Sequence, residues 1–254
     1  MISDDYFPVF NQPNVSLETG KISQITEKGI EIDGVETEYD LIVCATGFRS
    51  VEFMHPIKIT GSGGRSLADV WSGGAKALYA MAVESLPNFA MLYGPNGNLG
   101  HNSIILMIEA QSRYINALIK EVLRAKMEGK SLTITPKKER VDEYNRTIQK
   151  VLQNSSFADP NCTSWYKDRK TGLITNNWSG TVVDYQKMLS KVDWSDYDLG
   201  GNGAEGLGEG KTTKIGRVVE ETTVSHRTMG IMAASMLAVA GAVALRNSRR
   251  LRLR

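Results

Sequence analysis

The sequence predicts an α/β fold, on three observations. Residues 21–32 contain two short segments with alternating apolar side chains, and the Asp33-Gly34 pair that follows them is a hairpin signal. Residues 41–45 form a continuous apolar run, which is typical of a strand buried on both faces. From Ser103 onward, apolar residues recur at the spacing of an amphipathic helix. Strands in the first part and a long helix after them give the α/β class.

The residues around the long helix supply its boundaries. Residues 88–93 (NFAMLY) predict a second buried strand, which Gly94-Pro95 ends. Asn102 or Ser103 is the candidate N-cap of the helix, and Gly129 is the candidate stop. The helix is therefore expected between these two points.

The chain beyond the long helix is more varied. Residues 137–153 predict a second helix, and the aromatic-rich stretch that follows it predicts packed loops and short elements. Residues 198–211 hold six glycines and no large core residue other than leucine, which is typical of a flexible linker. The domains expected from these signals are a first part over 1–110, a helical and loop segment over 111–198, a flexible linker over 199–228, a hydrophobic helix over 229–245 and a basic tail over 246–254.

The composition argues against several classes of function. Charged residues make up 23% of the chain and the formal net charge is +2, so the charge balance does not favour nucleic acid as a partner. Two cysteines cannot form a disulfide framework, and the three scattered histidines lack the spacing of metal ligands. The first ten residues lack the pattern of a secretory signal, so the main domain is expected in the cytosol. Cys44, inside the apolar run, is expected to be inert packing.

The C-terminal end predicts a membrane anchor. Residues 229–245 carry no charge, and the last nine residues contain five arginines. A seventeen-residue helix spans about 26 Å at 1.5 Å per residue, and the thinnest eukaryotic bilayer cores measure about 27 Å. A buried or surface helix is the alternative, but the glycine-rich linker separates the segment from any core that it could join. We therefore expect a single-pass anchor in the membrane.

Residues 94–103 (GPNGNLGHNS) place three glycines and three asparagines directly before the long helix. Their spacing fits neither a dinucleotide fingerprint nor a P-loop. What remains is a loop with little side-chain bulk ahead of a helix N-terminus, where free N–H groups and the helix dipole favour negative charge or hydrogen-bond acceptors. On the residues alone, an ordinary loop and a ligand-binding loop both stay open.

Three motifs in order give a more specific indication. They are YDLIVCATGF (39–48), LPNFAMLYGPNGNLGHNSI (86–104) and CTSWYKDRKTGLITNNWSGTVVDY (162–185). Together they resemble the C-terminal part of the flavin-dependent Baeyer–Villiger monooxygenases, and most of all the fungal members of secondary metabolism, over about residues 2–195. The resemblance implies an FAD- and NADPH-dependent oxidoreductase that inserts one oxygen atom into a ketone or a related substrate.

The resemblance also implies a doubly wound, Rossmann-like FAD-binding domain, of which this chain holds the later part. The turn at Ala45, Thr46 and Gly47 would pass the FAD. The helix that starts near Asn102 would point its dipole at the flavin, and His101 would be a loop histidine near the flavin edge. The residues that would line this edge are Gly94, Pro95, Asn96, Asn98 and Leu99.

Further positions follow from the same resemblance. Four aromatic residues would pack the C-terminal segment around the substrate side. The family usually has glycine where this chain has Ala80, and a bulky aromatic residue where it has Ala90. The four aromatic residues are Trp165, Tyr166, Trp178 and Tyr185.

Some motifs that the resemblance implies are missing from the sequence. No GxGxxG follows a strand, so the FAD pyrophosphate site and the NADPH fingerprint are both absent. No catalytic residue can be assigned, because the region that supplies the catalytic arginine in the family lies upstream. We therefore expect a truncated monooxygenase that lacks the first βαβ unit of its sheet. The alternative is a non-catalytic, membrane-tethered remnant of a flavoprotein fold.

Overall fold

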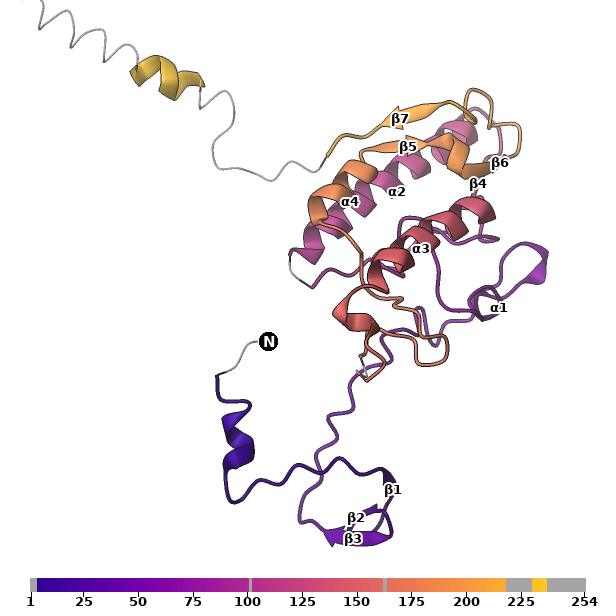
Figure 1. The fold of residues 1–254 in the computed structure, drawn as a ribbon. Helices are drawn as coiled ribbons and strands as arrows, with labels where there is room; N and C mark the ends of the chain where they lie inside the picture. The colour runs from indigo at the N-terminus through magenta and orange to yellow at the C-terminus, as the bar shows by residue number, and fades with distance from the viewer. Residues whose placement is uncertain (1–3, 101, 162–163, 218–229, 237–254) are drawn as a thin grey trace, which may run out of the picture. The chain divides into compact units, whose positions relative to one another are not determined.

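The computed structural model describes residues 4–100, 102–161, 164–217 and 230–236. The chain forms two compact units, Met1–Phe48 and Arg49–Arg254, called here unit 1 and unit 2 (Figure 1). Residues 1–110, expected to form one part of an FAD domain, are therefore shared between the two units.

Unit 1 contains a short 3-10 helix and a three-stranded antiparallel sheet. The Asp33-Gly34 pair joins the second and third strands, with φ angles of 50° and 81°. Positive φ at both central residues is what a type I′ hairpin turn requires, so the predicted hairpin is confirmed. The elements are η1 (Pro8–Asn11), β1 (Ile22–Ile25), β2 (Gly29–Ile32) and β3 (Val35–Glu38), and the strand order is β1-β2-β3.

The apolar run at residues 41–45 does not form the predicted buried strand. It has no regular secondary structure, and Leu41 and Val43 are 77% and 78% exposed. A strand needs a neighbour that takes its backbone hydrogen bonds, and no described strand pairs with this run. The prediction is therefore wrong for this structure. Cys44 is exposed as well, so its expected role in packing is also wrong.

Unit 2 holds the longer helices and two small antiparallel sheets (Figure 1). Its elements are η2 (Ser62–Gly64), α1 (Leu67–Val70), α2 (Ile104–Met127), β4 (Thr133–Pro136), α3 (Lys138–Leu152), η3 (Ser156–Ala158), α4 (Val182–Met188), β5 (Lys191–Asp193), η4 (Trp194–Asp196), β6 (Tyr197–Gly200) and β7 (Thr212–Lys214). β4 pairs with β6 and β5 pairs with β7, while α4 and β5 pack against α2. The α/β class is confirmed, but all pairs of named strands in the described residues are antiparallel.

The two long helices lie where the sequence predicts them. Ser103 is the N-cap of α2, and its hydroxyl accepts a hydrogen bond from the N–H of Leu106 at 3.4 Å. Gly129 follows the C-terminus with φ 69°, the left-handed conformation that ends many helices. α3 starts two residues after Pro136 and buries Val141 and Ile148 in the core. Periodicity together with a cap and a stop was sufficient for α2, and the sequence pattern of residues 137–153 was sufficient for α3.

Residues 88–93 do not form the predicted strand either. They are mostly irregular, and Asn88 and Tyr93 have φ angles of 54° and 58°, which a regular strand does not adopt. The Asn88 side-chain amide donates to the carbonyl of Leu132 at 3.0 Å and accepts from the N–H of Ile134 at 2.8 Å, and the backbone N–H of Asn88 donates to the carbonyl of Ile134 at 2.9 Å. Asn88 thus contacts β4 at a single point, through its side chain and its backbone.

The glycine-rich segment 198–211 packs against unit 2, although its composition predicts a flexible linker. It includes the end of β6, and Leu207 lies against the main core cluster. A Cβ on Gly201 would lie 2.3 Å from the carbonyl oxygen of Ser131, and one on Gly203 would lie 2.5 Å from the Cβ of Ala125. These two glycines permit close approach between segments.

No helix within the described residues is long and apolar enough to cross a membrane. The predicted anchor over 229–245 and the basic tail over 246–254 lie outside the described residues, except for 230–236. That short stretch is helical and exposed.

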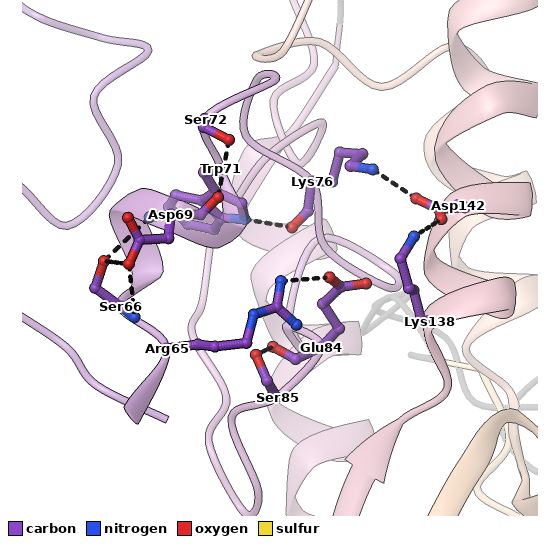
Figure 2. A network of polar contacts seen from close by, with 10 residues as sticks. All are labelled: Arg65, Ser66, Asp69, Trp71, Ser72, Lys76, Glu84, Ser85, Lys138 and Asp142. Atoms are coloured by element: carbon purple, nitrogen blue, oxygen red, sulfur yellow. Dashed lines mark hydrogen bonds and ion pairs between the residues drawn. The ribbon is translucent and has the colours of Figure 1, made fainter. Parts of the chain in front are cut away.

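A polar network joins the region around α1 to α3 (Figure 2). Lys76 Nζ lies 2.5 Å from Asp142 Oδ1, and Lys138 donates to Asp142 Oδ2. Burial acts to raise the pKa of Asp142, but the hydrogen bonds from the two ammonium groups outweigh it and lower the pKa below its usual value. Nearby, Ser66 and Asp69 form a capping box at the start of α1.

We expect Asp142→Asn to destabilise unit 2 by about 1 kcal/mol at neutral pH, because the partly exposed ion pairs are screened by water. The lowered pKa means that the carboxylate stabilises the fold above its unfolded-state pKa, which is about 3.9. This contribution is lost as the pH falls through the lower pKa of the folded state. Urea unfolding between neutral and acidic pH should therefore show the two proteins converging at the acid end. Glu139→Gln, on the same helix and without an ion pair in the described residues, is the control; an equal effect there would contradict the assignment.

Candidate functional site

The loop Gly94–Leu99 is buried along its whole length and is held by a second segment, residues 174–178. The N–H of Asn96 donates to the carbonyl of Thr175 at 2.8 Å, and the N–H of Asn98 donates to the carbonyl of Asn176 at 3.0 Å. The N–H of Trp178 returns a bond to the carbonyl of Asn98 at 2.7 Å. The predicted loop is therefore one half of a two-segment structure.

Asparagine side chains reinforce this pairing. Asn96 Nδ2 donates to the carbonyls of Ile174 and Asn177 at 2.8 Å and 2.7 Å. Asn98 Nδ2 donates to Asn177 Oδ1 at 3.3 Å, and its Oδ1 accepts from the hydroxyl of Tyr93 at 2.8 Å. Residues 174–177 are not among the site residues predicted from the sequence. The sequence signal that could have indicated this segment is the asparagine pair Asn176-Asn177, followed by Trp178.

The glycines of the loop permit close contact with an adjacent turn. The N–H of Gly94 donates to the carbonyl of Ala80 at 3.1 Å. A Cβ on Gly94 would lie 2.6 Å from that same carbonyl oxygen, and a Cβ on Gly97 would lie 2.9 Å from the carbonyl oxygen of Gly94. The bulk-free sequence of the loop is thus required by its packing, whatever ligand it contacts.

Left-handed backbone conformations at non-glycine residues cluster around the loop. Tyr79, Ala80, Tyr93 and Asn96 have φ angles of 54°, 58°, 58° and 59°. Each such residue costs about 1–2 kcal/mol, and strain of this kind concentrates at functional sites. The positive φ at Ala80 also gives a physical reason for the glycine that the family usually has there.

Three buried side-chain oxygens at the interface of the two segments have no hydrogen-bond partner among the residues that the structure describes. They are Asn96 Oδ1, Thr175 Oγ1 and Asn176 Oδ1. Buried polar atoms are nearly always paired, so a cluster of unpaired ones needs an explanation such as a ligand or ordered water. The surrounding protein covers all three oxygens, so they do not by themselves identify a ligand.

The N-terminus of α2 adds a favourable field next to the loop. The hydroxyl of Ser103 accepts a hydrogen bond from the N–H of Leu106. The other N–H groups of the first turn have no acceptor within the helix, as in any α-helix. The 24-residue helix concentrates its positive dipole end here. An acceptor-rich or negatively charged group is therefore favoured at this position.

A hydrogen-bond network centred on the buried Asp196 holds the side chain of Tyr79, which belongs to the strained Tyr79-Ala80 turn. The hydroxyl of Tyr79 donates to Asp196 Oδ2 at 2.6 Å, and Arg140 Nε donates to Asp196 Oδ1 at 2.7 Å. Burial, followed by the hydrogen bond to Asp196, raises the pKa of Tyr79 far above its usual value, so the phenol stays a donor. The hydrogen bond that Arg140 itself donates to Asp196 raises the pKa of Arg140.

The other predicted site residues are placed differently. Ala45, Thr46 and Gly47 belong to unit 1, where they are exposed and lie outside any strand, whereas the loop Gly94–Leu99 belongs to unit 2. Within unit 2, the structure brings the loop residues together in one buried segment. His101 lies outside the described residues.

The four predicted aromatic residues divide into two kinds. Tyr185 is fully buried, and Trp178 packs against the main core cluster. Tyr166 packs edge-on against Phe157, while Trp165 is 56% exposed. Tyr185 is therefore a core residue, Trp178 is a partly buried residue at the end of the second segment, and Trp165 is not a core residue.

Comparison with curated proteins places this site in context. The FAD-binding monooxygenase ktnD of Aspergillus niger is 54% identical over 229 residues, which are 90% of this chain and 38% of that protein. A Baeyer-Villiger monooxygenase of Streptomyces coelicolor is 31% identical over 200 residues, 78% of this chain and 38% of that protein. The chain is homologous to part of the Baeyer–Villiger monooxygenases.

Solved monooxygenase structures agree with this relationship. Cyclohexanone monooxygenase from Rhodococcus sp. Phi1 bound to NADP+ matches with a TM-score of 0.61 at 25% identity, over 77% of this chain and 38% of that chain. OTEMO in complex with FAD and NADP matches in fold with a TM-score of 0.63 at 20% identity, over 78% of this chain and 37% of that chain. The chain thus spans less than two fifths of the length of these relatives. No family model matches it.

Proposed function

We propose that this chain is the C-terminal part of an FAD- and NADPH-dependent monooxygenase that inserts one oxygen atom into a ketone or a related substrate. The observation that carries the proposal is the 54% identity to an FAD-binding monooxygenase over 90% of the chain. The match to a Baeyer-Villiger monooxygenase at 31% identity supports the reaction type. No observation specifically favours the alternative of a non-catalytic remnant.

In this proposal the loop Gly94–Leu99 lies along the flavin edge, and the N-terminus of α2 points at it. Bound FAD supplies the redox chemistry, and the protein binds it, orients it and excludes water. Support comes from the left-handed conformations at Tyr79, Ala80 and Tyr93 around the loop, because strain of this kind concentrates at functional sites. The turn at 45–47 would contact the same FAD within a doubly wound domain. No residue is assigned a catalytic role.

The remaining parts of the proposal rest on sequence. NADPH and a small organic ketone are the expected further ligands, because relatives include monooxygenases solved with NADP. A single-pass anchor over 229–245, with the main domain in the cytosol, is supported by the uncharged segment and the arginine cluster after it.

We expect the purified chain to bind FAD weakly, because it lacks the GxGxxG motif that holds the pyrophosphate. Flavin that remains after incubation with excess FAD and desalting is seen as visible absorbance. Gly100 offers a sharp test, because it is exposed and an added Cβ would meet nothing within 4 Å. Gly100→Phe should block the loop and weaken FAD binding roughly 10-fold or more without unfolding the chain. Gly73→Phe, at an equally open and exposed glycine, is the matched control and should bind like the wild type. A chain that binds no FAD, or a Gly100→Phe variant that binds normally, contradicts the proposal.

A further inference from the structure

Gln111 is a polar residue at an interior position of α2. It is 0% exposed and lies on the face of the helix that also buries Met107 and Tyr114. Both ends of its side chain are used: Oε1 accepts from the N–H of Tyr93 at 2.9 Å, and Nε2 donates to the hydroxyl of Tyr185 at 2.7 Å. An apolar side chain could fill this helix position, but it would leave the Tyr93 N–H and the Tyr185 hydroxyl without these two hydrogen bonds.

The first hydrogen bond holds the residue that precedes the loop. Tyr93 has φ 58°, and its N–H has no backbone acceptor among the described residues, so Gln111 satisfies it. The Tyr93 hydroxyl in turn donates to Asn98 Oδ1 at 2.8 Å. Fixing Tyr93 therefore constrains both the beginning and the end of the loop.

The second hydrogen bond reaches the turn on the other side of Gly94. The hydroxyl of Tyr185 donates to the carbonyl of Tyr79 at 2.7 Å, and the next carbonyl, that of Ala80, accepts from the N–H of Gly94. Gln111 is thus linked to the strained Tyr93 backbone directly and to the strained Tyr79-Ala80 turn through one hydroxyl. These two links flank the point where the loop begins.

We propose that Gln111 is a positioning residue that sets the conformation of the Gly94–Leu99 loop for the cofactor, through its hydrogen bonds to Tyr93 and Tyr185. The inference rests on the proposed function, since it takes this loop to be the flavin contact. A buried polar network that is fully satisfied specifies one arrangement of the groups it joins. Without it, the left-handed conformations at Tyr79, Ala80 and Tyr93 lose the contacts that over-determine them.

The test uses the full chain and three substitutions. Gln111→Leu removes both hydrogen bonds, whereas Gln111→Glu keeps an acceptor for the Tyr93 N–H. Val192→Ala, at a buried position of β5 outside the two hydrogen-bonded segments, is the control for a general loss of core stability. Hydrogen exchange of residues 91–99 is measured without FAD, and FAD affinity is measured by titration of flavin fluorescence.

We expect Gln111→Leu to speed exchange of the Tyr93 amide and to weaken FAD binding, each roughly 10-fold or more relative to Val192→Ala. Gln111→Glu should restore protection of the Tyr93 amide. Exchange in Gln111→Leu that matches Val192→Ala would overturn the positioning role, whether or not FAD binds. If Gln111→Leu loses protection of the Tyr93 amide but keeps its FAD affinity, the conformation that Gln111 gives the loop does not serve cofactor binding, and the proposal is overturned. A wild-type chain that binds no FAD overturns the proposed function, and the exchange data then decide separately whether Gln111 sets the loop.

Discussion

Replacing Gly94 with alanine is expected to destabilise unit 2 by about 2–4 kcal/mol and to displace the loop that follows it. The new Cβ would lie 2.6 Å from the carbonyl oxygen of Ala80 and 2.7 Å from the sulfur of Met91. The sulfur belongs to a flexible side chain and can move, but the carbonyl belongs to a strained turn whose own hydrogen bonds fix it. The N–H of Gly94, which donates to that carbonyl, would be pushed away from its acceptor. Urea unfolding gives the stability, and retained flavin absorbance gives the state of the loop.

The matched control for this substitution is Gly73→Ala. Gly73 is exposed, has open space where the added methyl group would lie and does not have a positive φ. It should stay within about 0.5 kcal/mol of the wild type. If Gly94→Ala is as stable as this control and binds FAD equally well, the close approach of the loop to Ala80 does not hold in solution.

Elements specified by local pattern could be predicted from the sequence. The periodicity of α2, the cap at Ser103 and the stop at Gly129 are all contained within one short stretch of chain, as is the Asp33-Gly34 turn. Each depends on the physical chemistry of neighbouring residues, so no knowledge of distant segments was needed.

The two predicted strands failed because an apolar run does not carry information about its partners. Residues 41–45 have the composition of a buried strand, but no described strand pairs with them. Residues 88–93 are broken by left-handed conformations at Asn88 and Tyr93, which propensity does not reveal. The prediction of a flexible linker over 198–211 has the opposite problem. Composition cannot distinguish a glycine that gives flexibility from one that permits close packing.

The candidate site shows the same division. The loop Gly94–Leu99 was predicted, because glycines and asparagines before a helix form a local signal. Its partner segment 174–178 lies about eighty residues away, and the hydrogen bonds between the two leave no periodic trace. Gln111 carried a weak signal as a polar residue in an apolar helix face. Its meaning depended on Tyr93 and Tyr185, which only the fold brings near.

The carboxylate of Asp196 is expected to be the other highly sensitive point of unit 2. Asp196 is 2% exposed, and it accepts from the hydroxyl of the partly buried Tyr79 and from Arg140 Nε. Asp196→Ala leaves a partly buried phenol and a partly exposed guanidinium without this acceptor. Removing one partner of a buried ion pair costs about 3–5 kcal/mol, and because Arg140 keeps Glu143 as a partner we expect about 2–4 kcal/mol here. Urea unfolding measures the effect, with Asp198→Ala, on the exposed side of β6, as the control.

A double-mutant cycle separates the Tyr79 hydrogen bond from the general loss of a buried charge. Tyr79→Phe removes only the hydroxyl, so Tyr79→Phe and Asp196→Ala combined should cost less than the sum of the two by about 1–2 kcal/mol. A coupling of this size means that Asp196 stabilises the fold partly through the strained Tyr79-Ala80 turn, and hence through the contact that holds Gly94. Additive effects would contradict this, because they would mean that Asp196 acts on Arg140 alone and that the turn keeps its conformation without it. In that case Tyr79→Phe should bind FAD with the affinity of the wild type. If the network is coupled, Tyr79→Phe should also weaken FAD binding.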